Sequence, residues 1–327
     1  MKRTPWIFVT GAPRSGTTFV GRILSMSLTV DYIHEPFNPD CGIPGVDQRF
    51  AYVDPEAVDP VWVERVSDLM RYRTRLRTGY YPEDTPARRV IKAIVGSRGP
   101  FHYRLARLNP VGRHVVLKDP IGCLLTEFLA RRFSMRPVVM IRHPAAFASS
   151  YKRLGWAPQL HALREQPALV SRYFAESHLL QETGNRVADA ARLWTALHTV
   201  LADQLERNPD WVVLRHEDLN ASPVETFAGL YARLELPWSA RTARGVGALT
   251  GTSNRAEARK ARVQDFRRDS KSLFDLRMAG LTPDERATVA DIVAPLAARW
   301  YPEFAEAQLT VGVPSHGEAH PAQGIHA

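Results

Sequence analysis

Hydrophobic positions along the chain gather in short β-branched runs that alternate with longer stretches of helical periodicity. Five of these runs predict strands, at Trp6–Thr10, Val30–His34, His114–Lys118, Pro137–Arg142 and Trp211–Arg215. Strands that alternate with helices are typical of a parallel sheet, because a crossover helix returns the chain to the same end of the sheet. We therefore expect an α/β fold with a central parallel sheet of about five strands, flanked by helices on both faces.

Helix signals fill the rest of the chain until the periodicity ends. Apolar residues spaced three to four apart predict a long amphipathic helix over 185–207. A capping residue followed by proline predicts helix starts at Ser222 and at Thr282. The pattern stops near Leu309, so we expect a single domain over residues 1–308 and a disordered C-terminal tail over 309–327.

Composition narrows the class of protein. Of the 327 residues, 45% are hydrophobic and 24% charged, which excludes disordered and fibrous classes. No apolar run approaches the length of a membrane helix, and we expect no signal peptide, because a strand-like run begins directly after Met1–Pro5. Two cysteines, Cys41 and Cys123, exclude a disulfide framework and favour a cytoplasmic location. The net charge of +9 suggests an anionic partner without naming one.

A candidate anion site follows the first predicted strand. Gly11 and Gly16 allow backbone N–H groups to converge, and the start of the next helix adds the positive end of its dipole. The same turn holds one cation, Arg14. Its other candidate ligands are Ser15, Gly16, Thr17 and Thr18. A strand, a glycine turn and a helix in this order make the expected sheet P-loop-like.

The turn departs from the loop that binds nucleoside triphosphates, because Thr17 stands where that loop has lysine. The run Pro13–Thr18 resembles the 5′-phosphosulfate loop of the sulfotransferases that use 3′-phosphoadenosine 5′-phosphosulfate (PAPS). It is more similar to the carbohydrate and bacterial branches of that family, which have arginine here. The resemblance implies PAPS as the co-substrate, adenosine 3′,5′-bisphosphate (PAP) as the product, and no metal.

A second candidate anion site lies midway along the chain. Arg142 ends the fourth predicted strand, and Ser150 follows two turns into the next predicted helix. An arginine and a serine so placed can contact one phosphate. Either feature alone would be interpreted as an exposed surface residue. Together, and in this order, they resemble the 3′-phosphate site of the sulfotransferases, which implies Arg142 and Ser150 as ligands.

The candidate catalytic residues end the second and third strands. Lys118 matches a lysine of the cytosolic sulfotransferases, but Pro120 stands where they have the catalytic histidine. Resemblance to the carbohydrate branch implies Glu35 as the general base, with Lys118 and Arg14 stabilising the departing phosphate oxygen. His34 is the rival base, and strand alternation predicts that only one of the two side chains reaches the site. Alternatively, Glu35 forms an ion pair with Arg14 that orders the loop.

The resemblance also bears on the nucleotide loop and on the acceptor. Three residues resemble a basic loop that closes over the nucleotide, although a solvated charge cluster is the alternative: Arg268, Ser270 and Lys271. The expected partner is a hydroxyl-bearing small molecule or glycan. Likeness to the carbohydrate branch favours a carbohydrate, glycolipid or glycosylated metabolite. We expect residues 41–109 to form the wall of the acceptor site.

Two other classes of function fit part of the sequence. A small-molecule P-loop kinase would use ATP and magnesium, with Asp119 as the metal-binding acid. The missing lysine and the extra Arg142 and Ser150 pair count against it. A non-enzymatic nucleic-acid binder would rest on net charge alone, because no recognition motif accompanies the charge.

Overall fold

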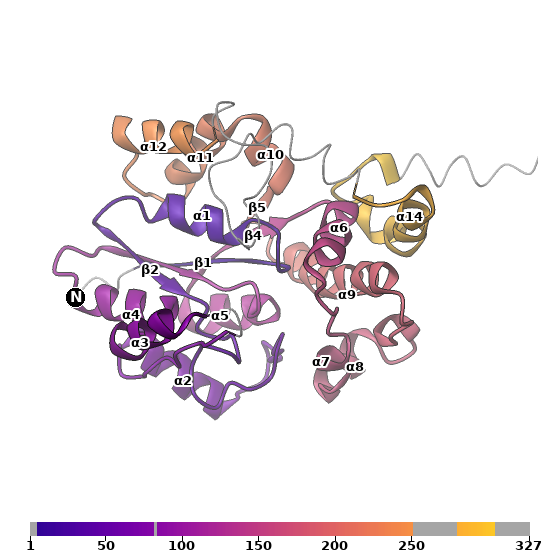
Figure 1. Cartoon of the computed structure of the whole chain (residues 1–327), viewed down its shortest axis with the longest axis horizontal. Coiled ribbons are helices and arrows are strands. Elements are labelled where there is room, and N and C mark those ends of the chain that lie inside the picture. The colour runs from indigo at the N-terminus through magenta and orange to yellow at the C-terminus, as the bar shows by residue number, and fades with distance from the viewer. Residues whose placement is uncertain (1–4, 82–83, 251–279, 305–327) are drawn as a thin grey trace, which may run out of the picture.

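The centre of the molecule is a parallel sheet with the strand order β2-β3-β1-β4-β5 (Figure 1). The computed structural model describes residues 5–81, 84–250 and 280–304. The strands are β1 (Trp6–Gly11), β2 (Val30–His34), β3 (His114–Lys118), β4 (Arg136–Ile141) and β5 (Val212–Arg215). The α/β fold and the five parallel strands are confirmed, and each predicted boundary lies within one residue of the observed one.

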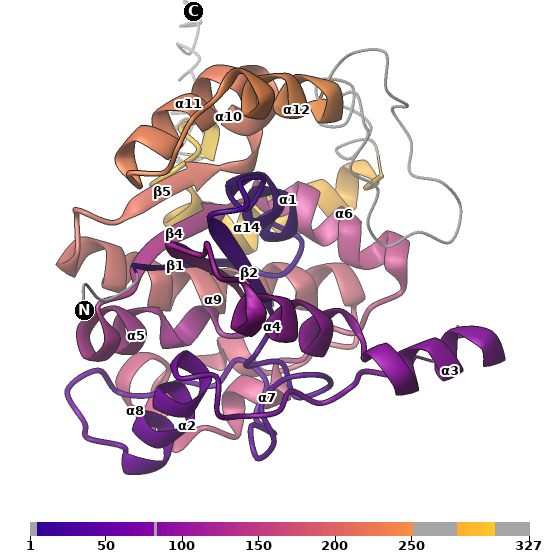
Figure 2. The same cartoon turned by 90° about the vertical axis from the view of Figure 1, so that its left-hand side faces the viewer.

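Helices cover both faces of the sheet (Figures 1 and 2). The described helices are α1 (Thr17–Leu24), α2 (Pro60–Met70), α3 (Pro86–Val95), α4 (Arg98–Leu108), α5 (Thr126–Phe133), α6 (Pro144–Leu154), α7 (His161–Arg164), α8 (Pro167–Tyr173), α9 (Arg186–Arg207), α10 (His216–Ala221), α11 (Pro223–Arg233), α12 (Ala240–Thr250) and α14 (Pro283–Ala297). Two short 3₁₀ turns, η1 (Cys123–Leu125) and η2 (His178–Leu180), complete the set.

Alternation along the strands divides the core between the two faces. Ile7 and Val9 of β1 pack with α1 and α11, in a cluster that includes Phe227 and Tyr231. Phe8 points to the opposite face and packs in a cluster with residues of α2, α4 and α5. A further cluster on that second side joins the end of β4 to α6, α9 and α14. Both faces of β1 are therefore buried, which explains its uninterrupted apolar run.

The predicted helix starts are observed, with one difference in how they are capped. Asn185 accepts N–H bonds from the first turn of α9, and Thr282 forms a reciprocal capping box with Glu285 at α14. The helix predicted at Ser222 also begins there, as α11, but the Ser222 side chain caps nothing. Its backbone N–H is instead bonded to Asp218, because α10 runs directly into α11.

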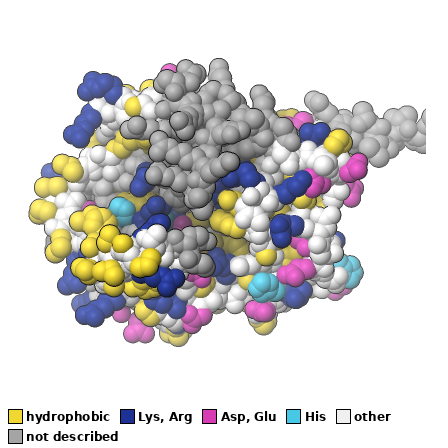
Figure 3. Space-filling model, in the orientation of Figure 1, with side chains coloured by type: hydrophobic (Ala, Val, Ile, Leu, Met, Phe, Trp, Pro, Cys, Tyr) yellow, Lys and Arg dark blue, Asp and Glu magenta, His cyan; other side chains and the backbone are white. Residues whose placement is uncertain are grey.

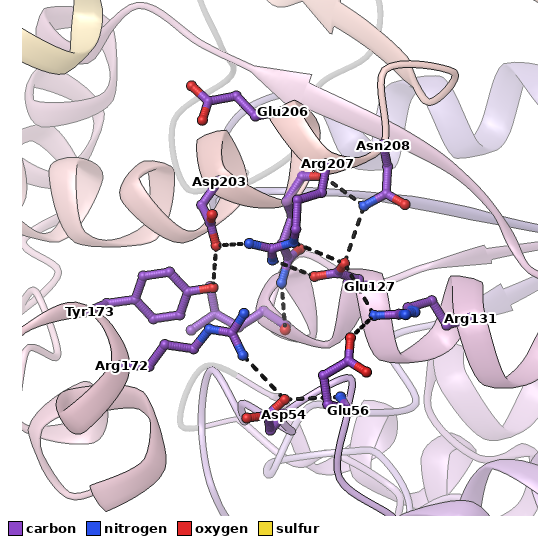
Figure 4. A network of polar contacts seen from close by, with 12 residues as sticks. Asp54, Glu56, Glu127, Arg131, Arg172, Tyr173, Asp203, Glu206, Arg207 and Asn208 are labelled. Atoms are coloured by element: carbon purple, nitrogen blue, oxygen red, sulfur yellow. Dashed lines mark hydrogen bonds and ion pairs between the residues drawn. The ribbon is translucent and has the colours of Figure 1, made fainter.

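A polar network ties the helices on the second side of the sheet together (Figure 4). At its centre, the buried Glu127 carboxylate of α5 accepts two hydrogen bonds from the Arg207 guanidinium, at 3.2 and 2.5 Å. Arg207 also pairs with Asp203, which accepts a hydrogen bond from Tyr173 at 2.6 Å. We call these residues, with Asn208, the Glu127 network.

Some expectations fall outside these observations. The expected tail, 309–327, lies beyond the described residues. Within the described part of the chain, no helix is long and apolar enough to cross a membrane. Cys41 and Cys123 are both buried free thiols.

Candidate active site

The turn between β1 and α1 has the shape of an anion cradle. Gly11 and Gly16 have φ angles of +134° and +96°, and a Cβ on Gly11 would lie 2.2 Å from the Met140 carbonyl oxygen. The first turn of α1 contains no acidic residue, and no side chain caps it at Gly16. Its uncapped N–H groups and its helix dipole therefore suit a bound anion. Arg14, in the same turn, has a left-handed φ of 71°.

The hydroxyl-bearing residues of the turn differ in their surroundings. Ser15 is fully buried, and its Oγ donates to the Ala12 carbonyl oxygen at 2.6 Å. That bond tightens the turn and leaves the lone pairs of Oγ rather than its proton for other contacts. Thr17 is buried and Thr18 is half-buried at the start of α1.

The two predicted anion sites lie in direct contact. Arg142 follows β4 and is buried, and its Nη1 donates to the Arg14 carbonyl oxygen at 2.6 Å. Arg14 in turn donates from Nε to Ser150 Oγ, at 3.2 Å, and its guanidinium lies 5.5 Å from the centre of the Trp156 ring. Residues from two distant parts of the sequence thus form one cationic cluster at the carboxyl ends of β1 and β4, where α/β folds place their ligands.

The ends of β2 and β3 bring Glu35 and Lys118 together. Strand register pairs His34 with Lys118, and the Glu35 N–H donates to the Lys118 carbonyl oxygen at 2.8 Å. The fully buried Lys118 ammonium forms an ion pair with the Glu35 carboxylate, which also accepts a hydrogen bond from Asn38 at 2.7 Å. The alternative ion pair of Glu35 with Arg14 is replaced by this one.

Electrostatics keep the Glu35 carboxylate charged. Burial alone would raise the pKa of Glu35, but the Lys118 ammonium, helped by His34 and Asn38, lowers it to about 2. Burial, followed by the Lys118 charge, lowers the pKa of His34 well below its usual value. At neutral pH, Glu35 is therefore a charged carboxylate and His34 beside it is a neutral imidazole.

The expectation that only one of His34 and Glu35 reaches the site is wrong. His34 Nε2 lies 3.7 Å from Glu35 Oε1. Alternation of side chains holds only inside a strand, and β2 ends at His34. Glu35 has a left-handed φ of 49°, which turns its side chain back toward that of its neighbour. His34 Nδ1 is bonded to the Tyr32 hydroxyl at 3.0 Å, two residues earlier on the same face of β2.

Asp119 has a structural position at the end of β3. It is fully buried, and its carboxylate accepts backbone N–H bonds from Phe37, Ile121 and Gly122, at 2.6 to 3.1 Å. Burial and then the negative charge of Glu35 raise the pKa of Asp119 to about 7. Both oxygens are engaged in fixing the turns after β2 and β3, a poor arrangement for the magnesium-binding acid of the kinase alternative.

Three residues at the site were not singled out as candidates from the sequence. Asn38 contacts Glu35, Trp156 lies over Arg14, and a Cβ on Gly16 would lie 2.6 Å from His216 Nδ1. Asn38 follows Glu35 by three residues, the spacing of a turn, which was the one available signal. The positions of Trp156 and His216 at the site depend on how α6 and α10 pack against the rest of the fold. A local sequence pattern does not indicate this packing. The candidates Arg268, Ser270 and Lys271 lie outside the described residues.

The fold and the cationic cluster together describe one class of protein. It is an α/β protein in which a candidate anion site and the Lys118–Glu35 pair lie at the same carboxyl edge of a parallel sheet. A model of the sulfotransferase family matches residues 5–240. The chain belongs to the sulfotransferase family, and the protein is a sulfotransferase. A search of curated proteins finds no match.

Solved sulfotransferase structures resemble the chain over most of its length. The sulfotransferase domain from the curacin biosynthetic pathway is 14% identical, with a TM-score of 0.47, and the match covers 90% of this chain and 99% of that one. Sulfotransferase STF9 from Mycobacterium avium is 14% identical, with a TM-score of 0.46 and coverage of 91% and 77%. Mouse sulfotransferase SULT7A1, solved in complex with PAP, is 11% identical, with a TM-score of 0.44 and coverage of 94% and 89%.

Proposed function

We propose that this sulfotransferase moves the sulfuryl group of PAPS to a hydroxyl of a carbohydrate, glycolipid or glycosylated metabolite. One observation carries the proposal: Arg142 donates to the backbone of Arg14, and Arg14 donates to Ser150. The two anion motifs are thus close enough for one nucleotide with two phosphate groups to contact both. The acceptor class is supported by Arg14 in the loop and by the Glu35-Pro36 pair, which resemble the carbohydrate branch.

The residues present fit PAPS. The turn would hold the 5′-phosphosulfate with backbone N–H groups of Arg14, Gly16, Thr17 and Thr18 and with the side chains of Arg14, Thr17 and Thr18. Ser15 would contribute when its hydroxyl turns from the Ala12 carbonyl oxygen to the bound anion. Arg142 and Ser150 would hold the 3′-phosphate, and we propose Arg268, Ser270 and Lys271 as further contacts. The positive φ angles of Gly11 and Gly16 support this fit, because they curl the backbone into a tight turn at the start of α1, and the missing Cβ atoms let Met140 and His216 pack against that turn.

Glu35 is the proposed general base. Its carboxylate oxygen accepts the proton of the acceptor hydroxyl while the hydroxyl oxygen bonds to sulfur. PAPS supplies the sulfuryl group, whose bond to the phosphate oxygen breaks and leaves its electron pair on that oxygen. Lys118, Arg14 and the N–H groups of the turn stabilise that negative charge. His34 is the second candidate base, and its lowered pKa and its bond to Tyr32 support a neutral, positioning role.

The Lys118–Glu35 pair couples the two proposed roles. While Lys118 contacts Glu35, the low pKa makes Glu35 a weak base. When Lys118 turns to a phosphate oxygen, Glu35 loses its strongest stabilising charge, and burial then raises its pKa toward the value that proton transfer needs. The ion pair would therefore keep the base inactive until the donor site is filled.

The extent of the domain and the cellular location of the protein are part of the proposal. We propose that residues 1–308 act as one sulfotransferase domain and that the protein works in the cytoplasm. The two buried free thiols, Cys41 and Cys123, support a reducing compartment.

Thermal unfolding with different nucleotides tests the donor. PAP should raise the Tm equally with magnesium and with EDTA, by mass action on the folded state, while ATP and GTP should have little effect. A shift with ATP that depends on magnesium, in the absence of a PAP shift, would support the kinase instead. A screen of sugar, glycolipid and lipid hydroxyls with labelled PAPS then identifies the acceptor class.

Arginine variants test the residues. Arg142→Ala should weaken PAP binding by about 10- to 100-fold, since a charge-assisted contact to phosphate is lost. Arg131→Ala is the matched control, because Arg131 is half exposed and pairs with Glu56 and Glu127 in a different part of the molecule. Equal PAP affinity in the two variants, measured by calorimetry, would overturn the assignment of Arg142.

A further inference from the structure

A surface helix usually buries its apolar side chains and exposes its charged ones, but helix α3 does the opposite. Its apolar side chains are exposed, Ile94 by 73% and Ile91 by 60%, whereas Lys92 is its one buried residue. Lys92 donates to the Gly79 carbonyl oxygen at 2.9 Å and pairs with Asp84, so its burial is satisfied. A charged residue thus anchors the helix, and the apolar face is left open.

The neighbouring helix α4 continues this apolar surface. Phe101, Leu105 and Leu108 follow one another at helical spacing and are exposed, Leu108 by 76%. Arg104 joins the helices, because its Nη2 donates to the Val95 carbonyl oxygen at the end of α3. We call the exposed apolar residues of the two helices the α3–α4 surface: Val90, Ile91, Ile94, Val95, Phe101, Leu105 and Leu108.

The figures show the surface from two sides. Helix α3 projects from the body of the molecule in Figure 2. In Figure 3, hydrophobic side chains gather at the lower left, over the place where Figure 1 shows α3 and α4, with Lys and Arg side chains around them. A contiguous exposed apolar patch of this kind marks an interaction surface rather than scattered surface residues.

The charge of this segment is one-sided. Residues 85–113 contain seven Lys and Arg and no Asp or Glu, and with Asp84 included the net charge is +6. Lys92 is buried and paired with Asp84, and the other six cations are exposed arginines on or beside α3 and α4: Arg88, Arg89, Arg98, Arg104, Arg107 and Arg113. A second copy of the chain would bring like charges together on the same surface, which disfavours self-association.

We propose that the α3–α4 surface docks the protein on an anionic lipid bilayer. A basic amphipathic helix with an exposed apolar face lies in the bilayer interface, where its apolar side chains enter the acyl boundary and its arginines contact lipid phosphates. Nucleic acid or an acidic protein surface would complement the positive charge but would leave the apolar residues unmatched. The proposal does not depend on the proposed acceptor.

Vesicle flotation with the full chain tests the proposal. Vesicles of phosphatidylcholine with roughly one-third phosphatidylglycerol should bind the protein about tenfold more than phosphatidylcholine alone, and binding should fall as salt rises from about 0.05 to 0.5 M. The double variant Ile91→Asp, Ile94→Asp should lower binding to the anionic vesicles about tenfold. The control Val58→Asp, Val61→Asp changes two other exposed valines, one just before α2 and one in its first turn, and should bind as the wild type does.

Each alternative outcome is distinct. The PAP-induced Tm shift should be the same in both double variants, which shows that they are folded. Equal binding to both kinds of vesicle, no binding by the wild type, or unchanged binding by the α3 variant would overturn the proposal. So would a dimer, measured by sedimentation, that the α3 variant dissociates while vesicle binding is absent, because a second copy would then cover the surface.

Discussion

Two carboxylates of this protein, the buried Glu127 and the half-buried Glu35, differ in how they are held. Glu127 accepts two hydrogen bonds from one guanidinium, and Asn208 donates to it as well, at 3.3 Å (Figure 4). Glu35 pairs with the single ammonium of Lys118 and projects from a residue with a left-handed backbone. The first has ordinary helical geometry in α5, whereas the second follows the last residue of a strand.

The difference indicates which pair can change partners. A bidentate guanidinium contact is directional and hard to replace, so the Glu127 network fits a structural role. A lysine is a point charge on a long stem, and its ammonium can turn to another anion without loss of geometry. Backbone strain at Glu35 and at Arg14 adds to the contrast, because such strain gathers at functional sites.

The largest expected effect separates the two carboxylates by activity. Glu35→Gln should lower kcat by about 10²- to 10⁴-fold, because the amide cannot accept the acceptor's proton. PAP should still raise the Tm of the variant. The matched control is Glu56→Gln, which removes an exposed carboxylate beside the Glu127 network and should leave kcat unchanged. Near-normal turnover of Glu35→Gln with labelled PAPS would exclude Glu35 as the base.

The next largest effect is expected at Glu127, where a substitution should change stability rather than activity. Glu127→Ala should lower the free energy of unfolding by about 2–3 kcal/mol, because Arg207 loses its buried partner while its own partial exposure limits the cost. Urea denaturation measures this change. The affinity for PAP should stay within about twofold of the wild type, since the network and the anion cluster have no residue in common. A large loss of PAP affinity without a loss of stability would contradict the structural role.

The sequence predicted the parts of this contrast that depend on strands. Each strand is a short β-branched run, and β1, β3 and β4 are buried along almost their whole length, so their limits were visible. Glu35, Lys118 and Arg142 each stand at a strand end, and parallel strands bring those ends to one edge; their roles came from the resemblance to the sulfotransferases.

Pairing and packing were not visible in the same way. That Lys118 pairs with Glu35 rather than leaving it to Arg14 depends on the register of β2 and β3 across 83 residues. The proximity of His34 to Glu35 depends on one left-handed residue that no propensity indicated. The Glu127 network depends on how α5 meets the end of α9, and the open face of α3 depends on a buried lysine. Such features arise from tertiary contacts alone.

A smaller effect concerns acid stability. The pKa of Glu35 is about 2 in the folded state, below its usual value near 4.5, so its contribution is complete above pH 4.5 and is lost as the pH falls toward 2. The wild type should therefore lose on the order of 2 kcal/mol more stability than Glu35→Gln between pH 6 and 3. Urea midpoints at each pH measure the difference. Parallel curves for the two proteins would show that the Lys118–Glu35 pair does not stabilise the fold.

The smallest effect compares one hydroxyl in each region. Tyr173→Phe removes the bond to Asp203, and Tyr32→Phe removes the bond to His34 Nδ1. Each should cost about 1 kcal/mol of unfolding free energy, the usual net value of one hydrogen bond. Only Tyr32→Phe should also lower kcat, by about two- to fivefold, because a loosened His34 no longer holds its place 3.7 Å from Glu35. If both variants lowered kcat alike, activity would be reporting general stability, and the two regions would not be separable by function.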